Sequence, residues 1–186
     1  MKIKNGWIEG VQSLISPNFD ERPLNCEPSL IVVHCISLPP GEFGGNGINQ
    51  LFTNNLSADE HPYFKKIHHL KVSSHVLIRR NGEIIQYVSF LDRAWHAGKS
   101  IYKGQESCND YSIGIELEGT EEVAYTTKQY NQLSRVIKML LESYPSLSPK
   151  HITGHSDIAP GRKTDPGPSF DWDHLFSSIN HSGASA

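Results

Sequence analysis

The chain has 186 residues, 37% hydrophobic and 20% charged, and 17 Lys and Arg against 20 Asp and Glu give a net charge of −3. This length suits one domain around a single core, and the composition excludes a disordered chain. No basic cluster suggests nucleic-acid binding, and no apolar stretch approaches the roughly 20 residues that span a bilayer. We therefore expect a globular domain with neither a nucleic-acid nor a membrane partner.

The first predicted strand covers residues 29–37, a continuous β-branched run typical of a strand buried on both faces, with His34 near its end. A long stretch rich in Pro, Gly and Asn follows from residue 38 to 70. Loops of this length are usually functional or mobile, so a lid role is a hypothesis for this one, and the sequence leaves open whether it moves over the site. Residues 74–88 alternate around Asn81-Gly82, which predicts a hairpin whose two turn residues both take positive φ.

The next predicted strand, residues 112–119, places Glu116 and Glu118 on one face and apolar side chains on the other. Two carboxylates thus leave the sheet on the same side. After this strand the apolar residues no longer alternate. They recur at helical spacing over residues 126–144. This segment opens with a Thr/Gln capping box and is the one long helix that the sequence predicts.

Two shorter elements complete the prediction: a strand within residues 150–155 and a helix within 172–179. We expect a single α/β domain over residues 1–179, with a central mixed β-sheet flanked by helices. The small, polar residues at the end, 180–186, are expected to form a flexible tail.

The cysteines are Cys26, Cys35 and Cys108, an odd number without paired spacing, so a disulfide framework is not expected. The first ten residues, MKIKNGWIEG, contain no apolar segment of the kind found in secretion signals. Both observations favour a cytoplasmic protein.

The residues with potential for metal chemistry lie at strand ends and in one rigid loop. His34 is near the end of the first strand, and His155 precedes a Pro/Gly-rich loop that carries Lys163 and Asp165. Imidazole and carboxylate ligands suit zinc, and three protein ligands with an open fourth position characterise a catalytic site. The three protein ligands would be His34, His155 and Asp165. A core histidine and a solvated surface turn explain the same residues, so spacing alone leaves both interpretations open.

Five segments carry a resemblance to a known family. They are VVHCISLPPGEFGG (32–45), HPYF (61–64), RAWHAG (93–98), CNDYSIGIELEGT (108–120) and TGHSDIAPGRKTDPGPSFDW (153–172). In this order they resemble the bacterial zinc amidases of the second N-acetylmuramoyl-L-alanine amidase family, which is related to phage T7-lysozyme-type amidases and to peptidoglycan-recognition proteins. The resemblance runs from about Trp7 to Trp172, nearly the whole chain.

The resemblance implies roles for the residues already singled out. The family's zinc ligands fall on His34, His155 and Asp165, its acid/base carboxylate on Glu116 and its lysine on Lys163. Zn²⁺ is then the expected cofactor, and cleavage of the amide between 1,6-anhydro-N-acetylmuramic acid and L-alanine the expected reaction. This activity would serve peptidoglycan recycling and influence β-lactamase induction. We expect a cytoplasmic monomer whose partner is a small anhydro-muramyl peptide.

Other polar residues compete for roles in the site. Glu118 rivals Glu116, which is preferred because it matches the family position and lies deeper in the strand. His75 and His96 are given structural roles, although His75 could support the metal site from behind. Cys35 is expected to be a small buried residue that points away from the metal, because adjacent strand residues face opposite sides.

Tyr63, Lys71 and Trp95 are the candidates for substrate binding, since a sugar and a short acidic peptide need an aromatic platform and a cation. The family often has Arg at position 71. Arg grips a carboxylate with two parallel hydrogen bonds, whereas Lys71 presents a point charge, so peptide preference is expected to differ.

Two alternative functions remain beside the recycling amidase. One is a lytic amidase that acts on the intact wall, against which the absence of an export signal and of a wall-binding module counts. The other is a peptidoglycan-binding module without catalysis, which would have lost a metal ligand or an acid/base group. Suitable residues occupy all five positions here: the three metal-ligand positions and the positions of Glu116 and Lys163.

Overall fold

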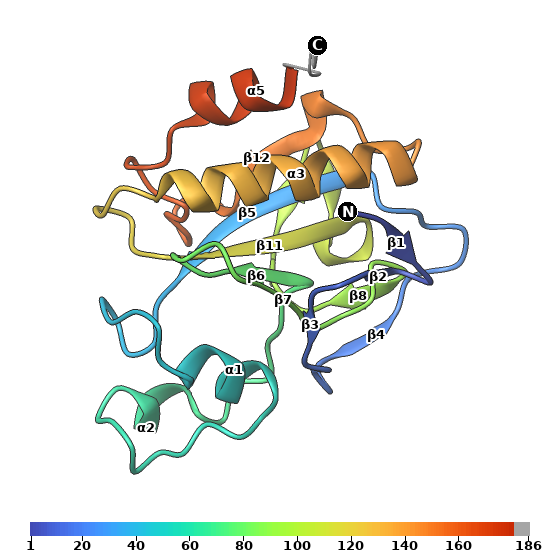
Figure 1. Ribbon diagram of the computed structural model, residues 1–186. Coiled ribbons are helices and arrows are strands. Elements are labelled where there is room, and N and C mark those ends of the chain that lie inside the picture. Colours follow the sequence, from blue (N-terminus) through green and yellow to red (C-terminus); the bar gives the residue numbers. More distant parts are fainter. Residues whose placement is uncertain (181–186) are drawn as a thin grey trace.

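The central sheet contains six strands in the order β12-β5-β11-β6-β7-β3 in the computed structural model, which describes residues 1–180 (Figure 1). The strands are β3 Gln12–Ser13, β5 Leu30–Ile36, β6 Val76–Ile78, β7 Ile84–Gln86, β11 Ser112–Glu118 and β12 Ile152–Gly154. β12, β5, β11 and β6 run parallel, β7 is antiparallel to β6, and β3 is parallel to β7. The expected mixed sheet of an α/β domain is confirmed.

Shorter elements surround this sheet. The two-stranded pairs are β1 Ile3–Lys4 with β2 Trp7–Ile8, β4 Phe19–Glu21 with β8 Asp92–Ala94, and β9 Ile101–Tyr102 with β10 Gln105–Glu106. The helices are α1 Gly47–Phe52, α2 Phe64–Ile67, α3 Thr127–Ser143, α4 His155–Ile158 and α5 Trp172–Asn180, with 3-10 turns η1 Cys108–Asp110 and η2 Pro149–His151. Within residues 1–180, no helix is both long and apolar enough to cross a membrane.

Helix α3 covers one face of the sheet, and α5 lies beside it on the same side (Figure 1). The capping box predicted for α3 is confirmed. Thr126 Oγ1 accepts from the Gln129 backbone N–H, and Gln129 Oε1 accepts from the Thr126 backbone N–H, both at 3.1 Å. The core between α3 and the sheet is fully buried and includes Ile31, Val33, Ile113, Ile115, Leu117, Leu133, Val136, Ile137 and Leu140. Burial of this apolar surface is the main force that holds α3 on the sheet.

Residues 38–70 contain α1 and α2 and lie on the opposite side of the molecule from α3 (Figure 1). They have a small core of their own, made of Leu38, Ile48, Leu51, Phe52, Leu56 and Phe64 packed against Leu77, Ile85 and Tyr87 of the hairpin. Polar contacts also tie the segment to the sheet: Gly44 N donates to Glu118 Oε1 at 2.7 Å, Arg79 Nη1 donates to Gly45 O at 3.1 Å, and the Tyr87 hydroxyl donates to Asn49 Oδ1. Movement of this segment as a lid stays a prediction.

The hairpin of β6 and β7 is confirmed, but its turn differs from the prediction. Arg79 and Glu83 are the last hydrogen-bonded pair, with Arg79 N donating to Glu83 O at 2.9 Å, so three residues connect the strands. Among them only Gly82 has positive φ, +87°. A three-residue connection with a left-handed glycine is a common hairpin form, and here Asn81 Oδ1 accepts from Glu83 N at 2.9 Å.

Other boundaries also shift. The predicted strand at 150–155 is shorter, because Pro149–His151 form η2 and His155 already begins α4. The predicted last helix is α5 and includes Asn180. The rest of the predicted tail, residues 181–186, lies outside the described residues.

A buried ion pair joins the end of β11 to the hairpin and generates a stability prediction. Arg79 Nη1 lies 2.9 Å from Glu118 Oε1, and the two side chains are 8% and 2% exposed. Glu118→Gln leaves the buried guanidinium without its counter-charge and should lower the free energy of unfolding by about 3–5 kcal/mol.

The matched control is Glu83→Gln. Glu83 also faces Arg79, at 3.6 Å, but its side chain is 44% exposed, so its loss should cost less than about 1 kcal/mol. Urea unfolding measures both variants, and equal losses would contradict the assigned importance of the buried pair.

Candidate active site

The carboxyl ends of β5, β11 and β12 meet at one edge of the sheet, where a cleft of about 510 Å³ opens. His34 of β5 is the register partner of Glu116 of β11. His155 follows β12 as the first residue of α4, and Asp165 lies in the loop after α4. All four line the cleft, so parallel strand pairing brings together residues that are far apart in the sequence.

Three electron-rich atoms in the cleft face a common point. His34 Nδ1 lies 3.0 Å from His155 Nδ1, and Asp165 Oδ2 lies 3.1 Å from each nitrogen. Ligands of a tetrahedral zinc ion with bonds of about 2.0–2.1 Å are separated by roughly 3.3 Å, close to the spacing seen here. Two imidazoles and one carboxylate are also a donor set that zinc accepts. The residues present therefore fit a divalent metal ion such as zinc.

Hydrogen bonds to Nε2 of each imidazole determine whether its Nδ1, which faces the other two groups, carries a proton or a free lone pair. His155 Nε2 lies 3.1 Å from Ala97 O, and since a carbonyl only accepts, Nε2 carries the proton and Nδ1 keeps a free lone pair. His34 Nε2 lies 2.9 Å from Nδ1 of His96. Burial lowers the pKa of His34 to about 4, so this imidazole is neutral at pH 7, the state in which histidine binds metal.

Glu116 is the carboxyl group in the cleft with unusual properties. The side chain is buried, and its Oε2 has no hydrogen-bond partner within the described chain. Burial, followed by the nearby charge of Asp165, raises the pKa of Glu116 well above its ordinary value, while the Lys163 charge opposes the rise. An unpartnered carboxyl group with a raised pKa beside a metal-binding group is suited to accept and return a proton.

Glu118 points from the same strand but has a different environment. Besides the ion pair with Arg79, its oxygens accept backbone N–H bonds from Gly44 and from Arg80 at 2.7 and 3.1 Å. Each of these contacts holds the Glu118 side chain in place within the fold. Glu118 is also absent from the residues that line the cleft, so the structure favours Glu116 over its rival.

The predicted substrate residues are only partly gathered in the cleft. Tyr63 and Trp95 line it, as does Lys163, the predicted catalytic lysine, which is exposed on the loop that follows α4. Lys71 is exposed and does not line the cleft, although its neighbours Leu70 and Val72 do. The cation of Lys71 therefore lies outside the cleft lining, and its role in binding stays a prediction.

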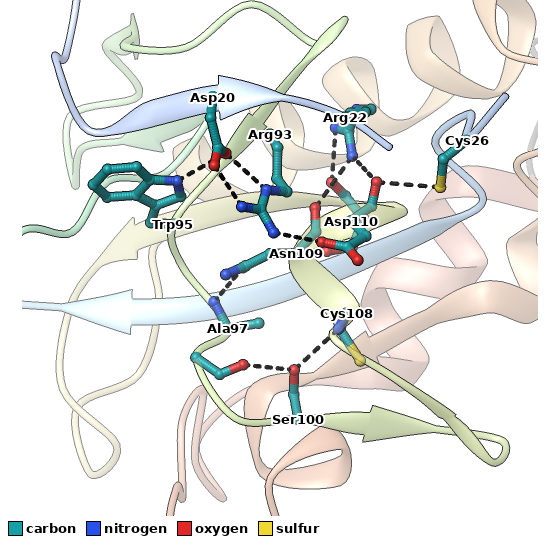
Figure 2. A network of polar contacts seen from close by, with 12 residues as sticks. Asp20, Arg22, Cys26, Arg93, Trp95, Ala97, Ser100, Cys108, Asn109 and Asp110 are labelled. Carbon is teal, nitrogen blue, oxygen red and sulfur yellow. Dashed lines mark hydrogen bonds and ion pairs between the residues drawn. The ribbon is translucent and has the colours of Figure 1, made fainter. Parts of the chain in front are cut away.

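Trp95 is held in a fixed orientation at the cleft wall. Figure 2 shows the carboxylate of Asp20 between the Trp95 indole and the Arg93 guanidinium. Trp95 Nε1 donates to Asp20 Oδ1 at 3.0 Å and Arg93 Nε to the same oxygen at 2.7 Å, while Arg93 Nη1 donates to Asp110 Oδ1 at 2.6 Å. A ring anchored in this way offers a rigid face, as stacking on a sugar requires.

The structure also tests the predictions made for His75, His96 and Cys35. His75 is structural: its Nδ1 accepts from Gly114 N at 3.0 Å, and its Nε2 lies 3.1 Å from Asp92 O. Cys35 packs with the core on the α3 side, as expected, but it is half-buried at the cleft edge, and burial raises the pKa of its thiol to about 12. His96 was given only a structural role, yet it contacts His34 directly.

A sequence signal for His96 was present in Gly114, a glycine inside a strand. Such a glycine often marks a close approach by another group. A Cβ at Gly114 would lie only 2.5 Å from the His96 ring, so the ring occupies the space of the missing side chain.

Residues 24–168 match the N-acetylmuramoyl-L-alanine amidase family. The chain belongs to this family. The amidase is 58% identical over 172 residues to the 1,6-anhydro-N-acetylmuramyl-L-alanine amidase AmpD of Escherichia coli K12, covering 92% of this chain and 93% of that relative. The similarity in sequence therefore extends over nearly the full length of both chains.

Solved structures agree with this assignment. A crystal structure of a selenomethionine AmpD derivative aligns with the amidase at a TM-score of 0.94 and 55% identity, covering 96% of this chain and 99% of that one. A complex of the E. coli amidase AmiD with anhydro-N-acetylmuramic acid-L-Ala-D-gamma-Glu-L-Lys aligns at 0.58 and 26% identity, covering 95% and 65%. The fold expected from the sequence is thus that of its family.

The buried Glu116 predicts a pH-dependent cost to folding in the metal-free amidase. Because its folded-state pKa is raised, the folded state binds more protons than the unfolded state above about pH 4.3, and stability falls as pH rises through the folded-state pKa. Glu116→Gln removes this loss, worth about 1.4 kcal/mol for each pKa unit of elevation.

Urea unfolding in the presence of a chelator should therefore show the Gln variant more stable than wild type at pH 8, with the difference fading towards pH 4. A difference that is constant with pH would show that the carboxyl group does not titrate as inferred.

Proposed function

We propose that this amidase hydrolyses the amide bond between 1,6-anhydro-N-acetylmuramic acid and L-alanine in small muropeptides, with a zinc ion held by His34, His155 and Asp165. The observation that carries the proposal is the unpartnered, buried carboxyl group of Glu116 beside this three-ligand group in one cleft. The substrate is supported by the name of the AmpD relative at 58% identity and by the anhydro-muramyl peptide in the AmiD complex.

In this mechanism Glu116 moves the proton and Lys163 stabilises charge. Held by His34, His155 and Asp165, a zinc ion would supply Lewis acidity, which would lower the pKa of water and polarise a carbonyl group. Glu116 accepts the proton of the attacking water and delivers it to the nitrogen of L-alanine as the C–N bond breaks. Lys163, which lines the cleft, places its ammonium group where negative charge develops on the carbonyl oxygen.

Substrate binding follows from the walls of the cleft. Tyr63 and the anchored ring of Trp95 provide aromatic surfaces for the anhydro sugar. Lys71 attracts the carboxylates of the peptide from outside the cleft, as a point charge rather than as a bidentate partner. The amidase therefore recognises the sugar by contact and the peptide mainly by charge.

The proposed setting is the cytoplasm, where a monomer would take part in peptidoglycan recycling and remove the muropeptides that induce β-lactamase. Its three cysteines are free, as suits a reducing compartment.

The decisive test is peptide release from two substrates, followed by mass spectrometry. The purified amidase should release peptide from anhydro-muramyl tripeptide, lose this activity with a chelator and regain it when zinc is restored. Release from intact cell wall at a similar rate would instead support a lytic amidase. No release from either substrate with zinc present would support a binding module.

The role of Glu116 has its own test. Glu116→Gln should lower kcat by about two to four powers of ten, because it removes general acid–base catalysis, while the zinc bound per chain stays unchanged. Glu83→Gln, which alters a carboxylate outside the cleft, is the control and should retain wild-type kcat. Near-normal turnover of the Glu116 variant would remove this residue from the mechanism.

A further inference from the structure

His96 is half-buried, lines the cleft and contacts the outer nitrogen of His34, yet it has no part in the mechanism above. Its Nδ1 lies 2.9 Å from His34 Nε2, and its Nε2 lies 3.1 Å from the hydroxyl of Ser112. The rings of His34 and His96 meet edge to face, with centroids 4.9 Å apart. His96 thus connects a strand hydroxyl to the outer nitrogen of a metal ligand.

The position of His96 is fixed from several sides. Asn109 Oδ1 accepts the backbone N–H bonds of His96 and Ala97 at 3.2 and 2.8 Å, and Figure 2 shows the bond to Ala97. On the other side the ring lies over Gly114, where even a Cβ would collide with it. These contacts hold the His96 ring in one orientation.

The same short segment serves both imidazole ligands. Ala97 O accepts from His155 Nε2 at 3.1 Å, while its neighbour His96 faces His34 Nε2. Metal-binding histidines usually donate their second ring N–H to such an outer partner, which selects the tautomer and holds the ring.

The proton positions around His96 decide whether His34 can bind a metal. If His96 carries its proton on Nε2 and donates it to Ser112 Oγ, its Nδ1 accepts from His34 Nε2, and His34 Nδ1 keeps a lone pair. If Ser112 donates instead, His96 Nδ1 carries the proton and donates to His34 Nε2. His34 Nδ1 is then protonated and unable to act as a ligand.

We propose that His96 is a positioning residue, which accepts a hydrogen bond from His34 Nε2 and so holds His34 in the tautomer and orientation that bind zinc through Nδ1. The inference rests on the zinc site of the proposed function. It assigns to His96 the outer-partner role that Ala97 O has for His155.

The test compares His96→Asn with His96→Leu, two variants of similar size. The amide oxygen of Asn can occupy the place of Nδ1 and accept from His34, whereas Leu offers no acceptor. Zinc affinity is measured by competition with a chromophoric chelator, independently of activity. His96→Leu should weaken zinc binding about 10–100-fold, and His96→Asn should restore most of this loss.

Equal weakening in both variants would reduce His96 to a space-filling role, and unchanged affinity of the Leu variant would overturn the proposal. If wild type itself fails to bind zinc or to cleave the anhydro-muramyl peptide, the proposed function fails. If wild type does both while His96→Leu binds zinc as tightly, only the positioning role fails.

A measurement on the wild type covers the case in which a variant does not fold. Long-range ¹H–¹⁵N NMR spectra of the zinc-loaded amidase report which ring nitrogen carries the proton. The proposal expects His96 to be protonated on Nε2 with Nδ1 as an acceptor. A proton on His96 Nδ1 would overturn it.

Discussion

The parallel pairing of β5 with β11 sets His34 opposite Glu116, and the rest of the site depends on this register. Side chains alternate along a strand, so a slip by one residue would turn Cys35 or Leu117 towards the position of His34 or Glu116. The core prevents such a slip, because Leu117 and its apolar neighbours on that face are fully buried under α3. The packing energy of the α3 face therefore also aligns the chemical groups on the other face.

Two glutamates on one face of β11 illustrate how surroundings assign function. Glu118 has a guanidinium and two backbone N–H groups as partners, which hold its side chain in the fold. Glu116, two residues earlier, has a raised pKa and a buried oxygen, Oε2, without a hydrogen-bond partner among residues 1–180. In the proposed mechanism, identical side chains thus serve as a structural ion-pair partner and as a proton acceptor. The unpartnered group weakens the fold locally, as functional sites often do, and the ion pair of Glu118 strengthens the same strand end.

The sequence was sufficient for elements with local signals. The predicted strands 29–37 and 112–119 and the helix 126–144 agree with the structure within one residue at each end, because their periodicity lies in contiguous residues. The metal group needed the family resemblance, since spacing alone allowed a surface turn. Gly114 indicates that some group approaches β11 closely, but the contact of His96 with His34 depends on where the segment after β8 crosses the sheet, and no local pattern encodes that path.

The outer partners of the two imidazoles are both uncharged, and this choice bears on the proposed chemistry. A carboxylate behind a ligand histidine makes the ring more basic and passes electron density towards the metal. Here His34 meets the neutral ring of His96 and His155 meets a backbone carbonyl, so Asp165 is the one anionic member of the three-ligand group. Less of the charge of a bound zinc ion is then neutralised, which favours Lewis acidity towards a carbonyl group. The positive charge of such an ion would also stabilise the ionised form of the buried Glu116, so the proposed metal ligands and the proposed proton acceptor would support one another.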